Sequence, residues 1–159
     1  MTGGIDALYR QHAPAVFRRA RRLLGHDADA HEVVHDLFLS LFERPEQYSR
    51  SSSMTTFLYA ATTNACLTRL RNARTRQRLA QENIAAVAPT SAVPSPEHVA
   101  LLRDALERMP EDLAQVVIYV HLDELTHEDV ARILGCSRRH VGDLLERAAT
   151  WARKAEAAQ

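Results

Sequence analysis

Apolar residues recur every three or four positions along most of this 159-residue chain, the spacing that places side chains on one face of an α-helix. No segment shows the strict alternation of apolar and polar residues that predicts a strand. We therefore predict an all-α fold made of two small helical domains joined by a flexible linker. The apolar stripe is clearest between residues 27 and 43, where it comprises Ala30, Val33, Val34, Leu37, Phe38, Leu41 and Phe42.

Helix-breaking and capping residues set the expected ends of the N-terminal helices. Pro14 should kink or divide the first helix, and Gly25 should end it. Asp27 is the expected N-cap of the second helix, which ends before Pro45. A third helix is predicted from about residue 54 to 79, and its inward side chains are expected to be Phe57, Leu58, Ala61, Ala65 and Leu70.

Residues 81–96 differ in composition from the segments on either side. They contain three prolines, several small residues and no Arg or Lys, which is typical of a linker. The predicted domains are therefore residues 1–80 and 97–159. The net charge of zero hides an asymmetry: residues 1–80 hold 12 Arg against 7 acidic residues, whereas the rest of the chain holds 8 basic against 13 acidic residues. Such a division suggests two modules with different surfaces, at least one of which can meet phosphate.

Composition excludes several other classes of protein. No apolar run approaches the roughly 20 residues that a membrane-spanning helix needs, so we expect a cytoplasmic protein. Cys66 and Cys136 lie far apart and match no metal or redox motif, so both are expected to be buried apolar residues. We predict no catalytic residue, no cofactor and no bound metal.

The C-terminal segment predicts a helix-turn-helix. After helices over about 97–109 and 111–121, Thr126 and Asp129 form a capping-box pattern, Gly135 and Cys136 form a short turn, and Ser137 can cap the last helix. The inner face of the first helix of the motif consists of Val130, Ala131, Ile133 and Leu134. That of the second consists of Val141, Leu144, Leu145 and Ala148.

Two clusters of side chains suit nucleic acid. The second helix of the motif begins Ser137-Arg138-Arg139-His140, which offers hydrogen-bond donors to base edges and phosphates. In the third helix, Phe57 and Tyr59 precede an arginine-rich stretch, and such aromatic side chains can stack on unpaired bases. That stretch contains Arg69, Arg71, Arg74, Arg76 and Arg78. The alternative interpretation of each cluster is a solvated basic surface.

Two segments together resemble a known family. The first reads HEVVHDLFLSLFERPEQYSRSSSMTTFLYAATTNACLTRLRNARTR and is similar to the second conserved region of extracytoplasmic-function sigma factors. The other reads ALERMPEDLAQVVIYVHLDELTHEDVARILGCSRRHVGDLLERA and is similar to their fourth region. The resemblance covers nearly the whole chain and implies a bacterial RNA polymerase sigma factor of the sigma-70 family, which selects promoters.

The resemblance also implies roles for particular residues. Glu32, His35 and Asp36 align with the surface that binds the clamp helices of the largest subunit of core RNA polymerase. The loop from Glu46 to Ser53 aligns with the element that captures a flipped base of the minus-ten motif. The residues that align with the segment that melts and reads that motif are Phe57, Tyr59, Asn64, Arg69, Arg71 and Arg74. Those that align with the reader of the minus-thirty-five element are Ser137, Arg138, Arg139, His140 and Arg147. The flap of the second-largest subunit, promoter DNA and an anti-sigma factor are the other implied partners.

Some positions depart from the family pattern. Ala60, Thr62 and Thr63 replace a stretch that is often more basic, and His35 takes a position usually held by Gln. In the last helix, family members often have basic residues where this chain has Gly142 and Leu144, and acidic Asp143 and Glu146 lie beside them. These changes bear on how strongly each domain holds DNA and on which bases it reads.

Three alternatives stay open at this point. His31-Glu32-Val33-Val34-His35 matches the H-E-x-x-H signature of zinc hydrolases, because an i, i+4 pair places both imidazoles on one side of a helix. No recognisable third ligand follows it. A stand-alone helix-turn-helix regulator would explain residues 97–155 and leave the arginine-rich helix unexplained. A sigma-like interaction protein without promoter activity is the third.

Overall fold

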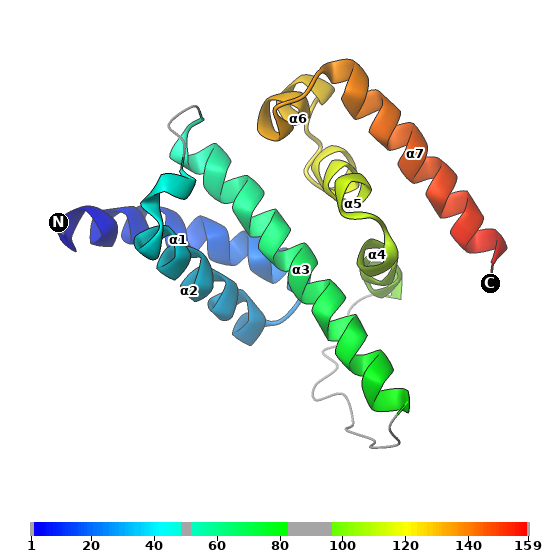
Figure 1. Cartoon of the computed structure of the whole chain (residues 1–159), viewed down its shortest axis with the longest axis horizontal. Coiled ribbons are helices and arrows are strands. Elements are labelled where there is room, and N and C mark those ends of the chain that lie inside the picture. Colours follow the sequence, from blue (N-terminus) through cyan, green and yellow to red (C-terminus); the bar gives the residue numbers. More distant parts are fainter. Residues whose placement is uncertain (1, 49–51, 83–96, 159) are drawn as a thin grey trace. The chain divides into compact units, whose positions relative to one another are not determined.

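The computed structural model describes residues 2–48, 52–82 and 97–158, and every regular element in these ranges is helical, as predicted. Between α2 and α3 lies a single 3-10 turn, η1 (Pro45–Gln47), and a π-helical turn, η2 (Ile118–Leu122), follows α5. The helices labelled in Figure 1 are α1 (Thr2–Leu24), α2 (Asp27–Glu43), α3 (Met54–Glu82), α4 (Glu97–Arg108), α5 (Glu111–Val117), α6 (His127–Leu134) and α7 (Arg138–Ala157).

The chain divides into two compact units, Met1–Cys66 and Leu67–Gln159. The boundary between the units falls inside α3, whereas the sequence placed the end of the first domain at residue 80. Most of the predicted linker, from residue 83 to 96, lies outside the described residues. The described helices include none that is long and apolar enough to cross a membrane.

The first unit is built on a hairpin of α1 and α2, which pack against each other (Figure 1). Gly25 makes the turn between them with a φ of 84°, and its N–H donates to the carbonyl oxygen of Arg21 at 2.9 Å. A positive φ is readily adopted by glycine, so the prediction that Gly25 ends α1 is confirmed. One core cluster of the unit draws on α1, α2 and the start of α3, and its buried members are Ala13, Val16, Val34, Phe38 and Leu58.

The structure rules out one of the two outcomes expected at Pro14, and the expected N-cap of α2 was wrong. Pro14 does not divide the first helix, because α1 continues through it from Thr2 to Leu24. Pro14 itself is exposed, and the burial of Ala13 and Val16 on either side stabilises the helix across the missing N–H. Asp27 is not the N-cap of α2: that position belongs to His26, and the Asp27 carboxylate instead pairs with Arg21.

The buried face of α3 also differs from the prediction. Leu58 and Leu70 are buried as expected, whereas Phe57, Ala61 and Ala65 are only half-buried. The most buried side chains include two threonines that the sequence assigned to no core: Thr62 and Thr63 are both 0% exposed. Their hydroxyls donate to the carbonyl oxygens of Leu58 (2.6 Å) and Tyr59 (3.0 Å), one turn earlier. Because these bonds satisfy the hydroxyls, the threonines can be buried without an unpaired polar group.

The second unit holds the predicted helix-turn-helix. Its α5, α6 and α7 pack together around Val116, Val130 and Val141, each of which is 0% exposed. The helix predicted over residues 111–121 ends as an α-helix at Val117 and widens into η2, where the N–H of Asp123 donates to the carbonyl oxygen of Ile118 at 3.0 Å. Of the two cysteines, Cys66 is buried as expected, whereas Cys136 is only half-buried.

Candidate nucleic-acid interface

The helix-turn-helix has well-defined caps on both of its helices. At the start of α6, the Thr126 hydroxyl accepts from the backbone N–H of Asp129 at 3.2 Å, and the Asp129 carboxylate accepts from the Thr126 N–H at 3.3 Å. The predicted capping box is therefore confirmed. The hydrogen bond from the Thr126 hydroxyl, at 2.6 Å, holds the pKa of the Asp129 carboxyl below its usual value.

The turn between α6 and α7 depends on a glycine and a serine. Gly135 caps α6 with φ 67° and ψ 36°, in the left-handed region. Ser137 then caps α7, since its hydroxyl accepts from the N–H of His140 at 3.1 Å. The sequence predicted the turn at Gly135 and the cap at Ser137. This turn fixes the point from which α7 begins and thus the direction in which its first side chains point.

The first turn of α7 presents a basic, solvent-facing surface. Ser137, Arg138, Arg139 and His140 are all exposed, which leaves them available to a large ligand. Arg147, two turns further along, is also exposed, and its guanidinium lies 3.4 Å from a carboxylate oxygen of Asp112 on α5. The structure thus brings the predicted residues of this helix onto one element, with its buried side formed by Val141, Leu144 and Ala148.

The start of α3 holds aromatic side chains in fixed positions. The Tyr48 hydroxyl donates to the carbonyl oxygen of Ser52 at 2.8 Å, and its ring meets that of Phe57 edge-on, with 5.5 Å between centroids. The Ser53 hydroxyl accepts from the N–H of Thr56 at 3.1 Å and caps the helix. Residues 49–51 of the predicted base-capturing loop lie outside the described residues.

One turn further along α3, an arginine from α1 covers Tyr59. The Arg19 Cζ atom lies 3.7 Å from the centroid of the Tyr59 ring, within the range of a cation–π contact. Its Nε and Nη2 atoms both donate to the Thr63 hydroxyl, at 3.0 and 2.8 Å. Arg19 was not among the residues singled out from the sequence, because nothing in the spacing of α1 relates it to a position 44 residues later.

The arginines in the second half of α3 face acidic residues of α4 and α5, in the second unit. Arg71 donates to the carbonyl oxygen of Met109 at 2.6 Å and lies 3.4 Å from the Glu111 carboxylate. Arg74 lies 3.4 Å from Asp104. Asp104 also pairs with Arg108 at 2.6 Å.

A fourth acidic residue of this segment, Glu107, is half-buried. Burial, and then the negative charge of Asp104, raise the pKa of Glu107. Sequence reasoning treated these acids only as a regional excess of charge. Their pairing with Arg71, Arg74 and Arg147 requires knowledge of which helices pack together.

The three residues of α2 that the resemblance assigns to polymerase binding are exposed. Glu32, His35 and Asp36 all face solvent, opposite the buried Val33 and Val34. His31 packs its ring against Phe17, with 4.5 Å between centroids. Within residues 2–48, 52–82 and 97–158, no three His, Cys, Asp or Glu side chains gather in an arrangement that would hold a metal ion.

Two family models match the chain in succession. The model described as Sigma-70 region 2 matches residues 8–76, and that described as Sigma-70, region 4 matches residues 100–150. The first therefore covers most of α1, all of α2 and most of α3, and the second covers α6 and the first two thirds of α7.

Curated relatives agree with these models. The chain is 28% identical over 143 residues to the ECF RNA polymerase sigma factor SigM of Mycobacterium tuberculosis, across 90% of this chain and 72% of that protein. It is 29% identical over 138 residues to the ECF RNA polymerase sigma factor SigE of Mycolicibacterium smegmatis, across 82% of this chain and 52% of that protein.

Two solved structures share the fold. One is the sigma factor RpoE in complex with the anti-sigma factor NepR from Bartonella quintana, with a TM-score of 0.50 and 20% identity over 91% of both chains. The other is CnrH in complex with the cytosolic domain of CnrY, with a TM-score of 0.55 and 17% identity over 100% of this chain and 91% of that one.

Proposed function

The chain belongs to the sigma-70 family of bacterial RNA polymerase sigma factors, in its extracytoplasmic-function group, and from this premise we propose how its residues divide the work. As a sigma factor it binds core RNA polymerase and directs it to promoters for the initiation of transcription. The single observation that carries this function is the succession of the two family models, over residues 8–76 and 100–150. A stand-alone helix-turn-helix regulator would account for the second match only.

Residues 97–159 read the minus-thirty-five element through α7. Arg138, Arg139 and His140 are exposed at the start of that helix, beyond the Ser137 cap. In a helix-turn-helix the second helix enters the major groove, where an Arg side chain can hold guanine with two hydrogen bonds. Arg147 contacts the phosphate backbone. No positive charge is added further along the helix by Gly142, Asp143, Leu144 or Glu146. The DNA sequence is therefore read mainly by the first turn of α7.

Residues 1–80 open and read the minus-ten element through α3. Phe57 and Tyr59 are half-buried aromatic side chains, suited to stacking on bases that have left the duplex. Asn64 supplies both a donor and an acceptor for a base edge. Arg69, Arg71 and Arg74 supply the positive charges that hold the phosphate backbone of the DNA. The unstacking of a base costs a few kcal/mol, so these contacts couple opening to recognition.

Residues 81–96 tether the two readers. A tether raises the effective concentration of the second reader once the first has bound, so two weak contacts act jointly. On α2, the exposed carboxylates of Glu32 and Asp36, with His35 between them, meet the clamp helices of the largest polymerase subunit. The C-terminal domain meets the flap of the second-largest subunit.

An anti-sigma factor is the expected regulatory partner. Two proteins with this fold were solved with partners bound: a sigma factor with an anti-sigma factor, and CnrH with the cytosolic domain of CnrY. An anti-sigma factor that covers α2 or α7 would compete with polymerase or with DNA. The chain itself catalyses nothing and acts in the cytoplasm, where polymerase works.

Transcript mapping tests the proposed function. The purified chain is added to core RNA polymerase from its own host with genomic DNA as template, and the 5′ ends of the RNA are sequenced. We expect new start sites that share paired upstream motifs. A chain that neither co-elutes with core enzyme nor changes the start sites would contradict the proposal.

Matched variants of α7 then test the proposed reader. Arg139→Ala is expected to relax the preference at one position of the upstream motif, with a loss of about 1–3 kcal/mol in binding to the preferred sequence. Arg153→Ala is the control, because Arg153 is exposed on the same helix near its far end. Equal effects of both changes on the motif would exclude base reading by Arg139.

A further inference from the structure

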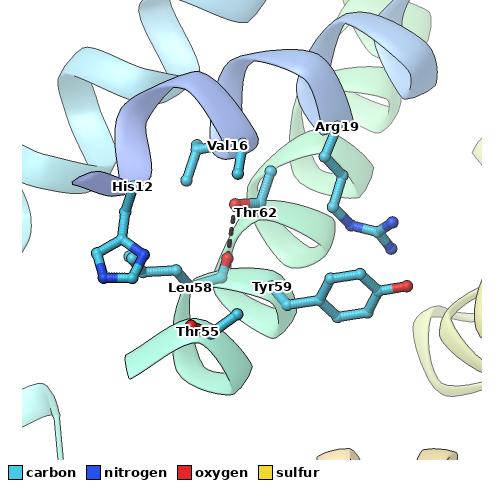
Figure 2. Close-up of a pocket in the computed structure, with 8 residues that line it drawn as sticks. His12, Val16, Arg19, Thr55, Leu58, Tyr59 and Thr62 are labelled. Carbon is cyan, nitrogen blue, oxygen red and sulfur yellow. Dashed lines mark hydrogen bonds between the residues drawn. The ribbon is translucent and has the colours of Figure 1, made fainter. Parts of the chain in front are cut away.

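A small pocket opens between α1 and the first half of α3 (Figure 2). Its volume is about 70 Å³. An enclosed cavity of about 150 Å³ can hold benzene, so this smaller pocket suits a group the size of a methyl better than a whole ring. The residues that line it are His12, Ala15, Val16, Arg19, Thr55, Leu58, Tyr59 and Thr62.

The inner part of the pocket is apolar. Val16 and Leu58 are buried core residues, and the Thr62 hydroxyl donates to the carbonyl oxygen of Leu58 at 2.6 Å (Figure 2). These two polar atoms are therefore directed at each other. A group that enters the pocket meets mainly carbon atoms, which favours an apolar substituent over a polar one.

The outer edge of the pocket combines an aromatic ring and a positive charge. Figure 2 shows Arg19 and Tyr59 on one side and His12 on the other. The guanidinium of Arg19 is held over the Tyr59 ring, with 3.7 Å from Cζ to the centroid, and by two hydrogen bonds to the Thr63 hydroxyl. No carboxylate lines the pocket.

Arg19 supplies a charge that α3 lacks at this point. From Met54 to Thr63 the helix contains no Lys or Arg. The guanidinium that reaches this stretch comes from the neighbouring helix instead. The same position along α3 carries Tyr59, to which the proposed function assigns a contact with the opened minus-ten strand.

We propose that this pocket receives the C5-methyl group of a thymine in single-stranded promoter DNA, with Arg19 beside the backbone phosphate of that strand. This inference rests on the proposed function and deepens it. Thymine is the only one of the four DNA bases that carries a methyl group, so an apolar, methyl-sized pocket selects it. The base itself stays outside, near the Tyr59 ring, because the pocket is too small to hold it.

The positive edge and the absence of acids argue for this occupant. A nucleic-acid strand presents an apolar base edge and an anionic phosphate within a few ångströms of each other, which matches the apolar interior beside Arg19. Tyr59, the proposed stacking residue, also lines the pocket. Arg19 thereby acts as a further DNA-contacting residue that lies outside α3.

A change to the DNA alone tests the pocket. The full chain bound to core polymerase is titrated with a fluorescent single strand that carries the minus-ten sequence found by transcript mapping, and each thymine is replaced in turn by deoxyuridine. At one position, loss of the methyl group should weaken binding about fourfold, as expected for one buried methyl-sized group. If no thymine responds, the inference is refuted.

Two substitutions locate the effect on the protein. Ala15 lines the pocket yet is exposed, so Ala15→Leu adds carbon atoms there without entering the core. This variant should lose the difference between thymine and deoxyuridine. Arg19→Gln should weaken all strands alike and lower the slope of log K against log salt by about 0.7, as expected for one phosphate contact on a single strand.

Arg18→Gln is the matched control, because Arg18 is an exposed neighbour on α1 that does not line the pocket. If Ala15→Leu and Arg19→Gln both behave as Arg18→Gln does, the inference is refuted. It is also refuted if Ala15→Leu weakens the binding of core polymerase and leaves DNA unaffected, since the pocket would then hold a protein side chain. A wild-type chain that fails to bind core polymerase contradicts the proposed function itself, which is a distinct outcome.

Discussion

Two glycines of the helix-turn-helix should respond in opposite ways to the same substitution. Gly135 lies in the turn with φ 67°, whereas Gly142 lies within α7. A Cβ atom added at either position would meet nothing within 4 Å. Steric clash with neighbours is therefore excluded at both positions, and only the backbone conformation distinguishes Gly135→Ala from Gly142→Ala.

The backbone terms set the magnitudes. A left-handed conformation costs an L-residue roughly 1–2 kcal/mol. Replacement of glycine also lowers the conformational entropy of the unfolded chain, which stabilises the fold by about 0.4–1 kcal/mol. Gly135→Ala should thus lower the free energy of unfolding by about 0.8 kcal/mol, the difference between the midpoints of these two ranges. Gly142→Ala should raise it by about 0.5–1 kcal/mol, because alanine is the better helix former.

The single tryptophan provides the assay. Trp151 lies in α7, so its fluorescence during urea denaturation reports on the second unit. Relative to wild type, the midpoint should fall for Gly135→Ala and rise for Gly142→Ala, with unchanged slopes. Shifts of the same sign in both variants would refute the assignment of a left-handed turn at residue 135.

Three further outcomes follow from the caps and the acidic residues, and the same fluorescence measurement checks each. Ser137→Ala removes the acceptor for the His140 N–H and should cost about 1 kcal/mol; an unchanged midpoint would exclude the cap. Because the pKa of Asp129 is lowered in the fold, its carboxylate stabilises the fold at pH values above the ordinary pKa of 3.8, and this contribution is lost as pH falls through the lowered pKa. Asp129→Asn should therefore make the midpoint less sensitive to acid. The raised pKa of Glu107 has the opposite effect, because its charged form is disfavoured in the fold. Glu107→Gln should therefore raise the midpoint at neutral pH, and this gain should decline as pH falls below the raised pKa and be absent below the ordinary pKa of 4.5.

The sequence predicted most features that depend on local rules, although the expected cap at Asp27 was wrong. The caps at Thr126 and Ser137 and the glycine turns at residues 25 and 135 depend on neighbours within a few positions, and all are present. The helical class and the motif at the C-terminus followed from periodicity. The proposed promoter-contacting residues lie on the expected helices, although their contacts with DNA stay a prediction.

Features that depend on packing between helices escaped prediction. Thr62 and Thr63 were not among the predicted inward side chains of α3, yet their hydroxyls are satisfied within the helix and both are buried. Pro14 reads as a break, yet packing on both sides keeps α1 continuous. The contacts of Arg19 and Asp104 depend on the packing of α1 against α3 and of α3 against α4. No spacing along the chain indicates which helices become neighbours.

The ion pairs of Arg71, Arg74 and Arg147 have a consequence for how promoter binding responds to salt. Each guanidinium lies near a carboxylate of the same unit, and all three pairs are partly exposed, so they are weak enough to exchange. When a phosphate replaces such a carboxylate, the DNA releases a cation, but the abandoned carboxylate takes one up from solution. The net release is then smaller than the usual value of about 0.9 ions per phosphate contact on duplex DNA. Because carboxylates of the protein already neutralise these arginines, the affinity for promoters should fall less steeply with salt than the number of arginines would suggest.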